Sequence, residues 1–414
     1  MAKITQMRAK ALFISPTPAL SPLLQAQGIP HMRELGKLGM EFTLLTFEHR
    51  DWSEQDKKRA ETLRATLAGW GIDWHILRYG RLPFVPNSTI DVFRGAAYAL
   101  KLIRRKGIEV VHCRSYVPAY MCLMLRRLTG IKFIFDMRGF LPDEYVEGGH
   151  WTMDRWEYKL AKRLEAKCLR AADGIVVTSE RMRETVLAGA NGPDEAESID
   201  GKLSVIPNLA DLSRFEPDDE KREAMRARHG LSDRIVFLWL VGGITKPHMP
   251  EEIVRFFLTC KESTPNARLL ILTGTRNADA MMLEAGLSPD DFLAYSVPPE
   301  DVVDYILMGD LGMNFCDPAH PGSAIKLAEY LGCGLPLVIN WAVENAVELT
   351  QEANTGVIVE AFDVEAYRKA AGRIVSLLAD REGLKARCRE VAQQRYCLRI
   401  AVDKYAEVYN RLLG

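Results

Sequence analysis

Short apolar runs alternate with longer amphipathic runs along this chain, and the pattern occurs twice. The first series of apolar runs covers 11–14, 42–46, 74–77, 110–112, 133–135 and 175–177. After a polar stretch, a second series covers 204–206, 235–240, 269–272, 311–315 and 337–339, and the tail from 364 to 413 has a helical pattern. Alternating strands and helices predict parallel sheets covered by helices on both faces, with right-handed crossovers.

The length of the chain predicts two such sheets, because 414 residues exceed what one hydrophobic core usually supports. We therefore predict an α/β protein with two Rossmann-like, doubly wound domains facing a cleft. The predicted boundaries are 1–190 for the first domain, 191–202 for a linker rich in turn formers and acids, 203–390 for the second domain and 391–414 for a C-terminal helix. Ligands of such sheets bind at the carboxyl ends of the strands.

Composition argues against several functions. A formal charge of −1 argues against nucleic-acid binding, which normally needs a basic surplus. The eight cysteines lie far apart without a Cys-x-x-Cys pair, which is typical of buried thiols in a reducing cytosol. No apolar run reaches the roughly 18 residues of a membrane span, and no metal-ligand spacing is visible. We predict a cytoplasmic protein that binds no metal and no cofactor.

The stretch 318–340 carries the strongest functional pattern. Gly322 and Ser323 can leave backbone N–H groups free at the start of a helix, where the peptide dipoles attract anions. Lys326 and Glu329 are three residues apart and so share a face of that helix. The run 332–336 then ends the helix with glycine followed by proline. The stretch predicts a phosphate site, and the alternative is an ordinary helix with a solvated ion pair.

Charged residues also end a buried strand of the first half. The strand at 133–135 delivers Asp136 and Arg138 to its carboxyl end, where isolated charges are costly unless they are paired or face a ligand. His112 ends the preceding strand, and its ordinary pKa suits proton transfer near neutrality. Ser115 and Tyr116 follow it at the predicted cleft edge. The alternatives are a structural Asp136–Arg138 pair and a hydrogen-bonded structural His112.

Two loops complete the candidate sites. Gly242 and Gly243 follow a predicted strand and permit close backbone approach, and Lys246 can reach a diphosphate as a mobile charge. In the first half, a proline-rich loop from Ser15 to Pro22 precedes Gly28 and a helix predicted over 30–38. Either loop could also be a plain connector.

The run Lys326-x-x-Glu329-Tyr-Leu-x-Cys-Gly-x-Pro336 resembles the donor-binding motif of GT-B glycosyltransferases, in particular retaining family 4, also called group 1. The segments 111–118, 133–144 and 240–246 are similar to further parts of that family, in its bacterial surface-polysaccharide branch. The resemblance implies a nucleotide-sugar donor and a C-terminal helix that packs back on the first domain. Its implied donor contacts are Gly242, Gly243, Lys246, Val297, Gly322, Ser323, Ala324, Ile325, Lys326 and Glu329.

The resemblance also implies roles in the first domain. Asp136, Arg138 and His112 take the catalytic positions, and the acceptor side comprises Ser15, Thr17, Gly28, Ser115 and Tyr116. The implied reaction is metal-independent transfer of a sugar, with retention, to a glycan, a lipid-linked glycan or a small molecule. A sugar-nucleotide epimerase or hydrolase stays open, because such enzymes share the fold. A non-catalytic binding subunit also stays open, because Pro321 and Gly243 replace residues often found at the site in the family.

Basic residues end two helices predicted in the first half, at 104–106 and 126–127. Such a cluster can hold an anionic membrane surface, with about 1 kcal/mol for each cation close to it. We therefore expect a peripheral contact with the inner membrane face. The alternative is that these cations only complement the helix dipoles, as in any helical protein.

Overall fold

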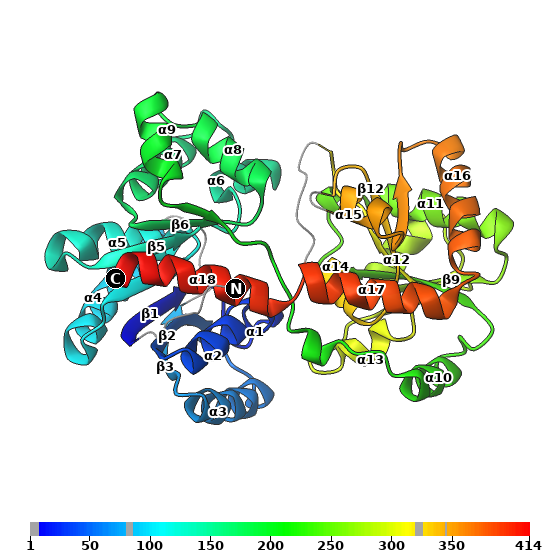
Figure 1. The fold of residues 1–414 in the computed structure, drawn as a ribbon, viewed down its shortest axis with the longest axis horizontal. Coiled ribbons are helices and arrows are strands. Elements are labelled where there is room, and N and C mark those ends of the chain that lie inside the picture. The colour runs from blue at the N-terminus through cyan, green and yellow to red at the C-terminus, as the bar shows by residue number, and fades with distance from the viewer. Residues whose placement is uncertain (1–7, 80–85, 319–325, 344–345) are drawn as a thin grey trace. The chain divides into compact units, whose positions relative to one another are not determined.

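A computed structural model describes residues 8–79, 86–318, 326–343 and 346–414. The chain forms two compact units (Figure 1). The first unit comprises Met1–Pro207 together with Arg399–Gly414, and the second comprises Asn208–Leu398. Each unit is built on a parallel sheet, as the alternating pattern predicts.

The first sheet has the strand order β3-β2-β1-β4-β5-β6-β7, with all neighbours parallel. Its strands are β1 (Ala9–Ser15), β2 (Met40–His49), β3 (Asp73–Tyr79), β4 (Val110–Arg114), β5 (Lys132–Asp136), β6 (Gly174–Val177) and β7 (Leu203–Val205). The helices are α1 (Pro22–Gln27), α2 (Ile29–Lys37), α3 (Glu54–Gly69), α4 (Pro86–Lys106), α5 (Tyr116–Thr129), α6 (Leu141–Glu147), α7 (Trp156–Ala171), α8 (Glu180–Ala188), α9 (Pro193–Asp200) and α18 (Leu398–Leu413). The adjacent strand residues Phe133 and Ile134 point to opposite faces, and both are fully buried, as expected of a sheet covered on both faces.

The second sheet has the order β10-β9-β8-β11-β12-β13 and is also parallel. Its strands are β8 (Ile235–Val241), β9 (Ala267–Thr273), β10 (Phe292–Tyr295), β11 (Leu311–Asn314), β12 (Leu337–Asn340) and β13 (Gly356–Val359). The helices are η1 (Leu212–Arg214), α10 (Asp219–Arg228), η2 (Lys246–His248), α11 (Pro250–Ser263), α12 (Ala278–Glu284), α13 (Val302–Ile306), α14 (Lys326–Gly332), α15 (Val347–Glu352), α16 (Val364–Leu377) and α17 (Arg381–Arg395), where η marks a 3-10 helix. The apolar run of β13 was not among the predicted strands.

The predicted linker over 191–202 is wrong. Its polar residues form α9, which begins with Pro193 and carries acids in its first turn, where they complement the helix dipole. The run 204–206, predicted as the first strand of the second domain, falls on β7, which pairs with β6 as the seventh strand of the first sheet. Along the chain, the boundary between the two units lies instead between Pro207 and Asn208.

The expected return of the C-terminal helix to the first domain is confirmed, although the helix starts at Leu398 rather than at 391. In Figure 1, α18 lies along the first unit. Lys132 Nζ of β5 donates to the Leu412 carbonyl at 2.5 Å, and Lys404 Nζ donates to the Val205 carbonyl at 2.8 Å. The end of the chain is therefore part of the first core.

Both sheets have a switch point where the strand order reverses, between β1 and β4 in the first and between β8 and β11 in the second. Ligands of open parallel sheets bind beside such points, outside the carboxyl ends of the strands. The loops that follow these four strands are therefore the places where functional side chains are expected.

In the second unit, Tyr330 fixes α14 on the sheet beside the switch point. Its hydroxyl accepts a hydrogen bond from Leu240 N at 2.7 Å, near the end of β8. The ring lies against Gly312 of β11, where a Cβ atom would stand 2.3 Å from the ring carbons. Glycine at 312 therefore lets a fully buried tyrosine lie flat on the sheet.

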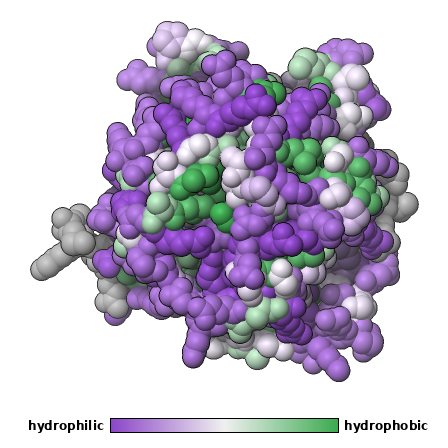
Figure 2. Space-filling model, turned by 90° about the vertical axis from the view of Figure 1, so that its right-hand side faces the viewer, coloured by the Kyte–Doolittle hydropathy of each residue, from purple (hydrophilic) through white to green (hydrophobic). Residues whose placement is uncertain are grey.

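Along the described parts of the chain, no helix is long and apolar enough to cross a membrane. The face shown in Figure 2 is mainly hydrophilic, with separate hydrophobic areas between polar ones. Such a mixed surface is ordinary for a globular protein.

Replacing Gly312 by alanine should destabilise the second unit, because the new methyl group would overlap the buried ring of Tyr330. We expect the free energy of unfolding in urea to fall by about 1–3 kcal/mol, the usual cost of overpacking. Gly372→Ala in α16 is the matched control, since a Cβ there meets no atom within 4 Å. The control should gain about 0.5–1 kcal/mol. Equal effects at both positions would contradict the packing role of Gly312.

Candidate functional site

A buried carboxylate stands at the carboxyl edge of the first sheet. Asp136 ends β5 and lies opposite Arg114, which ends β4. Arg138 Nη1 donates to Asp136 Oδ1 at 3.2 Å, and Arg114 Nη1 lies 3.7 Å from Asp136 Oδ2. Because Asp136 is only 1% exposed, its charge has to be compensated inside the protein, and the two guanidinium groups do so.

His112 and two tyrosines of α18 close the network around this carboxylate. His112 Nε2 and the Tyr405 hydroxyl each donate to Asp136 Oδ2 at 3.3 Å. Since a carboxylate only accepts, Nε2 carries the proton and Nδ1 accepts from the Tyr409 hydroxyl at 2.8 Å. Burial alone would raise the pKa of Asp136, but Arg138, His112 and Arg114 together hold that pKa well below its usual value.

These contacts match the structural alternatives for His112 and Asp136, because the side chains of both are buried and hydrogen-bonded within the protein. Their catalytic roles stay predictions. Arg138 differs, since 15% of its side chain is exposed. It is therefore the network member best placed to meet a ligand.

Gln27, at the end of α1, joins the two arginines. Its Oε1 accepts from Arg114 Nη2 at 3.0 Å and from Arg138 Nη2 at 3.2 Å. Burial, with the neighbouring Arg138, lowers the pKa of Arg114 to about 10, which leaves it protonated at neutral pH. Two guanidinium groups thus face one carboxylate, and the excess positive charge suits an anionic ligand group.

The predicted acceptor-side residues have different environments. Ser15 is buried, and its Oγ accepts from Thr17 N at 3.1 Å within a local turn. Gly28 lies between α1 and α2, where a Cβ would stand 2.4 Å from Leu24 Cδ1. Tyr116 is 1% exposed and donates to Glu165 Oε2 at 2.7 Å. Its predicted position at the cleft edge is wrong, because its ring packs in the first core.

Ser115 has a strained backbone at the switch point. It follows β4 with φ 71° and ψ −172°, a region that is nearly restricted to glycine. Its N–H donates to the Asp136 carbonyl at 2.8 Å, and its side chain makes no capping bond to α5. Strain of this kind collects at binding and catalytic sites, so Ser115 remains a candidate on the acceptor side.

In the second unit, the backbone after β8 is open. Gly242 is exposed, and a Cβ built on it meets no atom within 4 Å. Its carbonyl accepts from Gly274 N at 3.1 Å, and Ile244 N donates to Thr275 Oγ1 at 2.9 Å. The loops after β8 and β9 are thus held together. The packing of the protein does not require glycine at 242, which leaves room for a ligand against the backbone.

Lys246 lies exposed in η2, and no described residue pairs with it. The loop after β11 joins this region, because Asp317 N donates to the Pro247 carbonyl at 3.1 Å. Val297 follows β10 at the same sheet edge and is half-buried. The predicted contacts Gly242, Gly243, Lys246 and Val297 therefore lie in loops at one edge of one sheet.

Lys326 and Glu329 belong to α14. Lys326 Nζ lies 3.5 Å from Glu329 Oε2, a weak contact, and Glu329 is buried. A helix that returns between parallel strands starts at their carboxyl edge, and Tyr330 attaches α14 near the end of β8. Lys326 is thus on the same edge as the loop after β8. The predicted contacts Gly322, Ser323, Ala324 and Ile325 lie outside the described residues.

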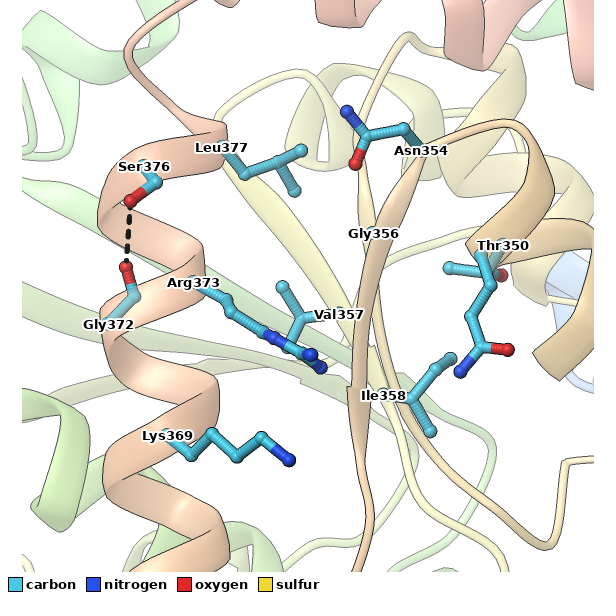
Figure 3. Close-up of a pocket in the computed structure, with 11 residues that line it drawn as sticks. Thr350, Asn354, Gly356, Val357, Ile358, Lys369, Gly372, Arg373, Ser376 and Leu377 are labelled. Carbon is cyan, nitrogen blue, oxygen red and sulfur yellow. Dashed lines mark hydrogen bonds between the residues drawn. The ribbon is translucent and has the colours of Figure 1, made fainter.

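A separate cavity of about 730 Å³ lies between the edge strand β13 and α16 (Figure 3). Figure 3 shows Lys369 and Arg373 pointing from α16 toward β13. Both cations pair with Glu360, at 2.5 Å and 3.4 Å. The cavity extends from Gly356, at the start of β13, to Leu377, at the end of α16. It is therefore distinct from the site at the carboxyl edge.

The described residues contain no group of three or more histidine, cysteine, aspartate or glutamate side chains arranged to hold a metal ion. Sequence reasoning missed Gln27, Arg114, Tyr405 and Tyr409 of the buried network, and also His31, whose ring lies 5.2 Å from that of Tyr405. Arg114 could have been noticed as a charge at the end of an apolar strand. The spacing of Tyr405 and Tyr409 places them on one helical face, but nothing local indicates which strand they meet.

Residues 31–199 match the model of the glycosyl transferase 4-like domain. Over 315 residues the chain is 24% identical to the GDP-mannose-dependent alpha-(1-6)-phosphatidylinositol monomannoside mannosyltransferase of Mycolicibacterium smegmatis, with 74% of this chain and 75% of the relative covered.

Among solved structures, the fold is similar to sucrose-phosphate synthase from Thermosynechococcus elongatus, with a TM-score of 0.74 at 16% identity over 98% of this chain and 99% of the other. It is also similar to HepE of Anabaena in complex with UDP and glucose, with a TM-score of 0.69 at 14% identity over 97% and 100%. At these identities the likeness establishes the GT-B fold.

His31 should make stability depend on pH. Its Nδ1 donates to the Gln27 carbonyl, while its buried Nε2 has no partner among the described atoms. Burial, with Arg138 nearby, lowers the pKa of His31 to about 3. The unfolded chain therefore binds the proton more readily, and the stabilisation present above about pH 6.5 is lost as pH falls toward 3. Its slope is about 1.4 kcal/mol per pH unit.

Urea unfolding between pH 7 and pH 5 measures this effect. His31→Asn keeps a donor near Nδ1 and should flatten the pH dependence, whereas the same change at the exposed His150 should not. Parallel pH profiles for wild type and His31→Asn would disprove the assignment.

Ser115→Gly should relieve the backbone strain after β4. We expect the free energy of unfolding to rise by about 1 kcal/mol, the lower end of the cost of such a conformation. Ser115→Ala keeps the Cβ atom and should bring no such gain. Urea unfolding of the two variants tests this, and a glycine variant no more stable than the alanine variant would contradict it.

Proposed function

We propose that the chain is a GT-B glycosyltransferase of the family 4 type, which moves a sugar from a nucleotide-diphosphate sugar to an acceptor hydroxyl with retention of configuration. The observation that carries the proposed donor site is the carboxyl edge of the second sheet. There the open backbone of Gly242 and Gly243 adjoins Lys246, which pairs with none of the described residues, and Lys326 begins α14 at the same edge.

A nucleoside diphosphate fits the chemistry of this edge. Its phosphates would lie against the backbone of the glycine pair, because a Cβ atom at Gly242 would meet no described atom within 4 Å. The two lysines supply positive charge where the leaving diphosphate gains negative charge. Glu329 would hold the ribose hydroxyls, and Val297 would present its backbone to the base.

The reaction that we propose is a front-face displacement. The acceptor oxygen forms a bond to the anomeric carbon as the bond from that carbon to the phosphate oxygen breaks. The acceptor proton passes to an oxygen of the departing phosphate, so no separate base is needed. The protein then acts mainly by positioning the reactants and by stabilising charge.

For the acceptor we propose a lipid-linked glycan on the side of the first unit. The mycobacterial relative is named for a phosphatidylinositol monomannoside acceptor and for GDP-mannose, which makes GDP-sugars the first donors to test. Arg138 would contact an anionic part of the acceptor, since it is the partly exposed cation of the buried network.

A peripheral contact at the inner membrane face is part of the proposal, together with a cytoplasmic location. Of the five cations expected to form it, Lys106 pairs with Asp73 and Arg126 with Asp173. Arg104, Arg105 and Arg127 have no partner among the described residues. These three are the candidates for binding anionic lipid.

The lysines should bind the diphosphate rather than the nucleoside. Lys246→Ala and Lys326→Ala should each weaken nucleoside diphosphate by about 10- to 100-fold, the usual range for a charged hydrogen bond, and leave the nucleoside unaffected. Lys369→Ala is the matched control, because this lysine of the same unit is exposed and pairs with Glu360. Equal losses for both ligands would show that the lysines do not touch the diphosphate.

Glu329→Gln tests the ribose contact in the same titrations and should weaken nucleoside and nucleoside diphosphate alike. Unchanged affinity would reassign Glu329 to a structural pair with Lys326.

A thermal-shift panel of UDP, GDP, ADP and CDP with their sugars identifies the donor. Release of nucleotide without an acceptor would favour an epimerase or hydrolase, and no binding at all would favour a non-catalytic subunit.

A further inference from the structure

An apolar groove of about 700 Å³ lies on the helical surface of the first unit. Helices α4, α5, α6 and α7 form it. Its floor is built from side chains that also pack on the first core, among them Val117, Tyr120, Leu123, Met124 and Leu141. The groove is therefore a continuation of the hydrophobic core to the surface.

Large apolar side chains stand exposed along the groove. Phe93 is 60% exposed, Trp156 61% and Leu160 44%. Trp151 and Tyr145 line the same groove and pack on each other, with ring centroids 4.9 Å apart. Contiguous exposed apolar surface of this kind marks an interaction site, whereas single exposed residues do not.

The charges around the groove are mainly positive. Arg126 and Arg170 line it but pair with Asp173 and Glu195. Arg127 and Lys167 are exposed, and the described part of the chain offers neither of them an ion-pair or hydrogen-bond partner. Glu157, which also lines the groove, is neutralised by Arg155 at 2.8 Å. The groove thus combines an apolar floor with cations free to bind an anionic surface.

In the sequence, the groove residues of α6 follow shortly after Arg138 of the buried charge network. Arg138 follows β5, and α6 begins with Leu141, which lines the groove.

We propose that this groove docks the first unit on a bilayer containing anionic lipid, with Phe93, Trp156 and Leu160 entering the hydrocarbon boundary and Arg127 and Lys167 binding lipid phosphates. The docking contact would bring a lipid-linked acceptor to the enzyme, and only this role of the contact rests on the proposed function. The groove also changes the sequence-based expectation, because it adds α7 and its exposed apolar residues to the basic helix ends.

A bilayer fits better than a protein partner for two reasons. Tryptophan and tyrosine beside lysine and arginine are the residues that settle at the membrane interface, with apolar bodies in the lipid and polar ends in water. Free cations around an apolar face add electrostatic attraction to anionic lipid, so binding should depend on both lipid charge and apolar contact.

Flotation of the full chain tests the proposal with vesicles of phosphatidylcholine, alone or mixed with phosphatidylglycerol. Wild type should float with the anionic vesicles at low salt, and less so at high salt. Arg127→Glu/Lys167→Glu should partition at least about 30-fold more weakly, from about 1 kcal/mol per lost cation. Lys58→Glu/Arg228→Glu is the matched control, because both residues are exposed and have no partner among the described residues.

Trp156→Ala/Leu160→Ala tests the apolar contact and should lower partitioning at least about tenfold, since each side chain would lose its burial in lipid. Trp341→Ala, at an exposed tryptophan of the second unit, is its control. Equal flotation of groove and control variants, or no binding of wild type at low salt, would overturn the proposal. Concentration-dependent dimerisation abolished by the groove variants would assign the face to a second copy instead.

Nucleotide-sugar binding in solution separates this inference from the proposed function. The groove variants should bind the donor as wild type does, since the donor residues lie in the second unit. Flotation without donor binding by wild type would sink the transferase proposal and leave the docking surface standing. Donor binding without flotation would do the reverse.

Discussion

The buried carboxylate of Asp136 is the interaction on which the first unit depends. It joins β4 through Arg114 and His112 and joins α18 through Tyr405, and Gln27 of α1 bridges the two arginines. A buried ion pair gains little net stability, because desolvation offsets the attraction. Its consequence here is positional, since the partners of one carboxylate fix where α18 lies and leave Arg138 partly exposed at the sheet edge.

The two units share the same sheet topology, but different residues occupy the switch points of their sheets. In the first unit the switch point is filled by a charged network and by the strained Ser115. In the second unit the described residues leave the switch point open, with the glycine pair after β8 and with Lys246, which pairs with none of them. A neutral tyrosine, Tyr330, does the anchoring there by binding the backbone of β8. The open edge suits a diphosphate, whereas the filled edge presents the partly exposed Arg138.

The apolar groove leaves hydrophobic surface of the first unit exposed to water. Helices α5 and α7 pack on the sheet with one face and leave part of another apolar face at the surface. Exposing this area costs free energy unless another surface covers it. A lipid surface would cover it while keeping Arg127 and Lys167 in contact with charge.

The sequence by itself determined the class of the fold and most of its strands. Hydrophobic periodicity is a local property, so the runs at 133–135 and 235–240 predict β5 and β8 correctly. The helix stop after Glu329 is equally local, since Gly334 adopts φ 80°. The likeness of 326–336 to a family motif also depends only on residues close in the chain.

Tertiary structure decided the rest. The unit boundary depends on the pairing of β7 with β6, which no local pattern predicts. The acids of 191–202 are as typical of a helix start as of a linker, and in the structure they belong to α9. Tyr116 looks available in the sequence but is covered by packing against Phe135. Tyr409 reaches His112 across 297 positions of the chain. Such partners are chosen by the burial of charge and apolar surface in the assembled core, and spacing along the sequence does not specify that choice.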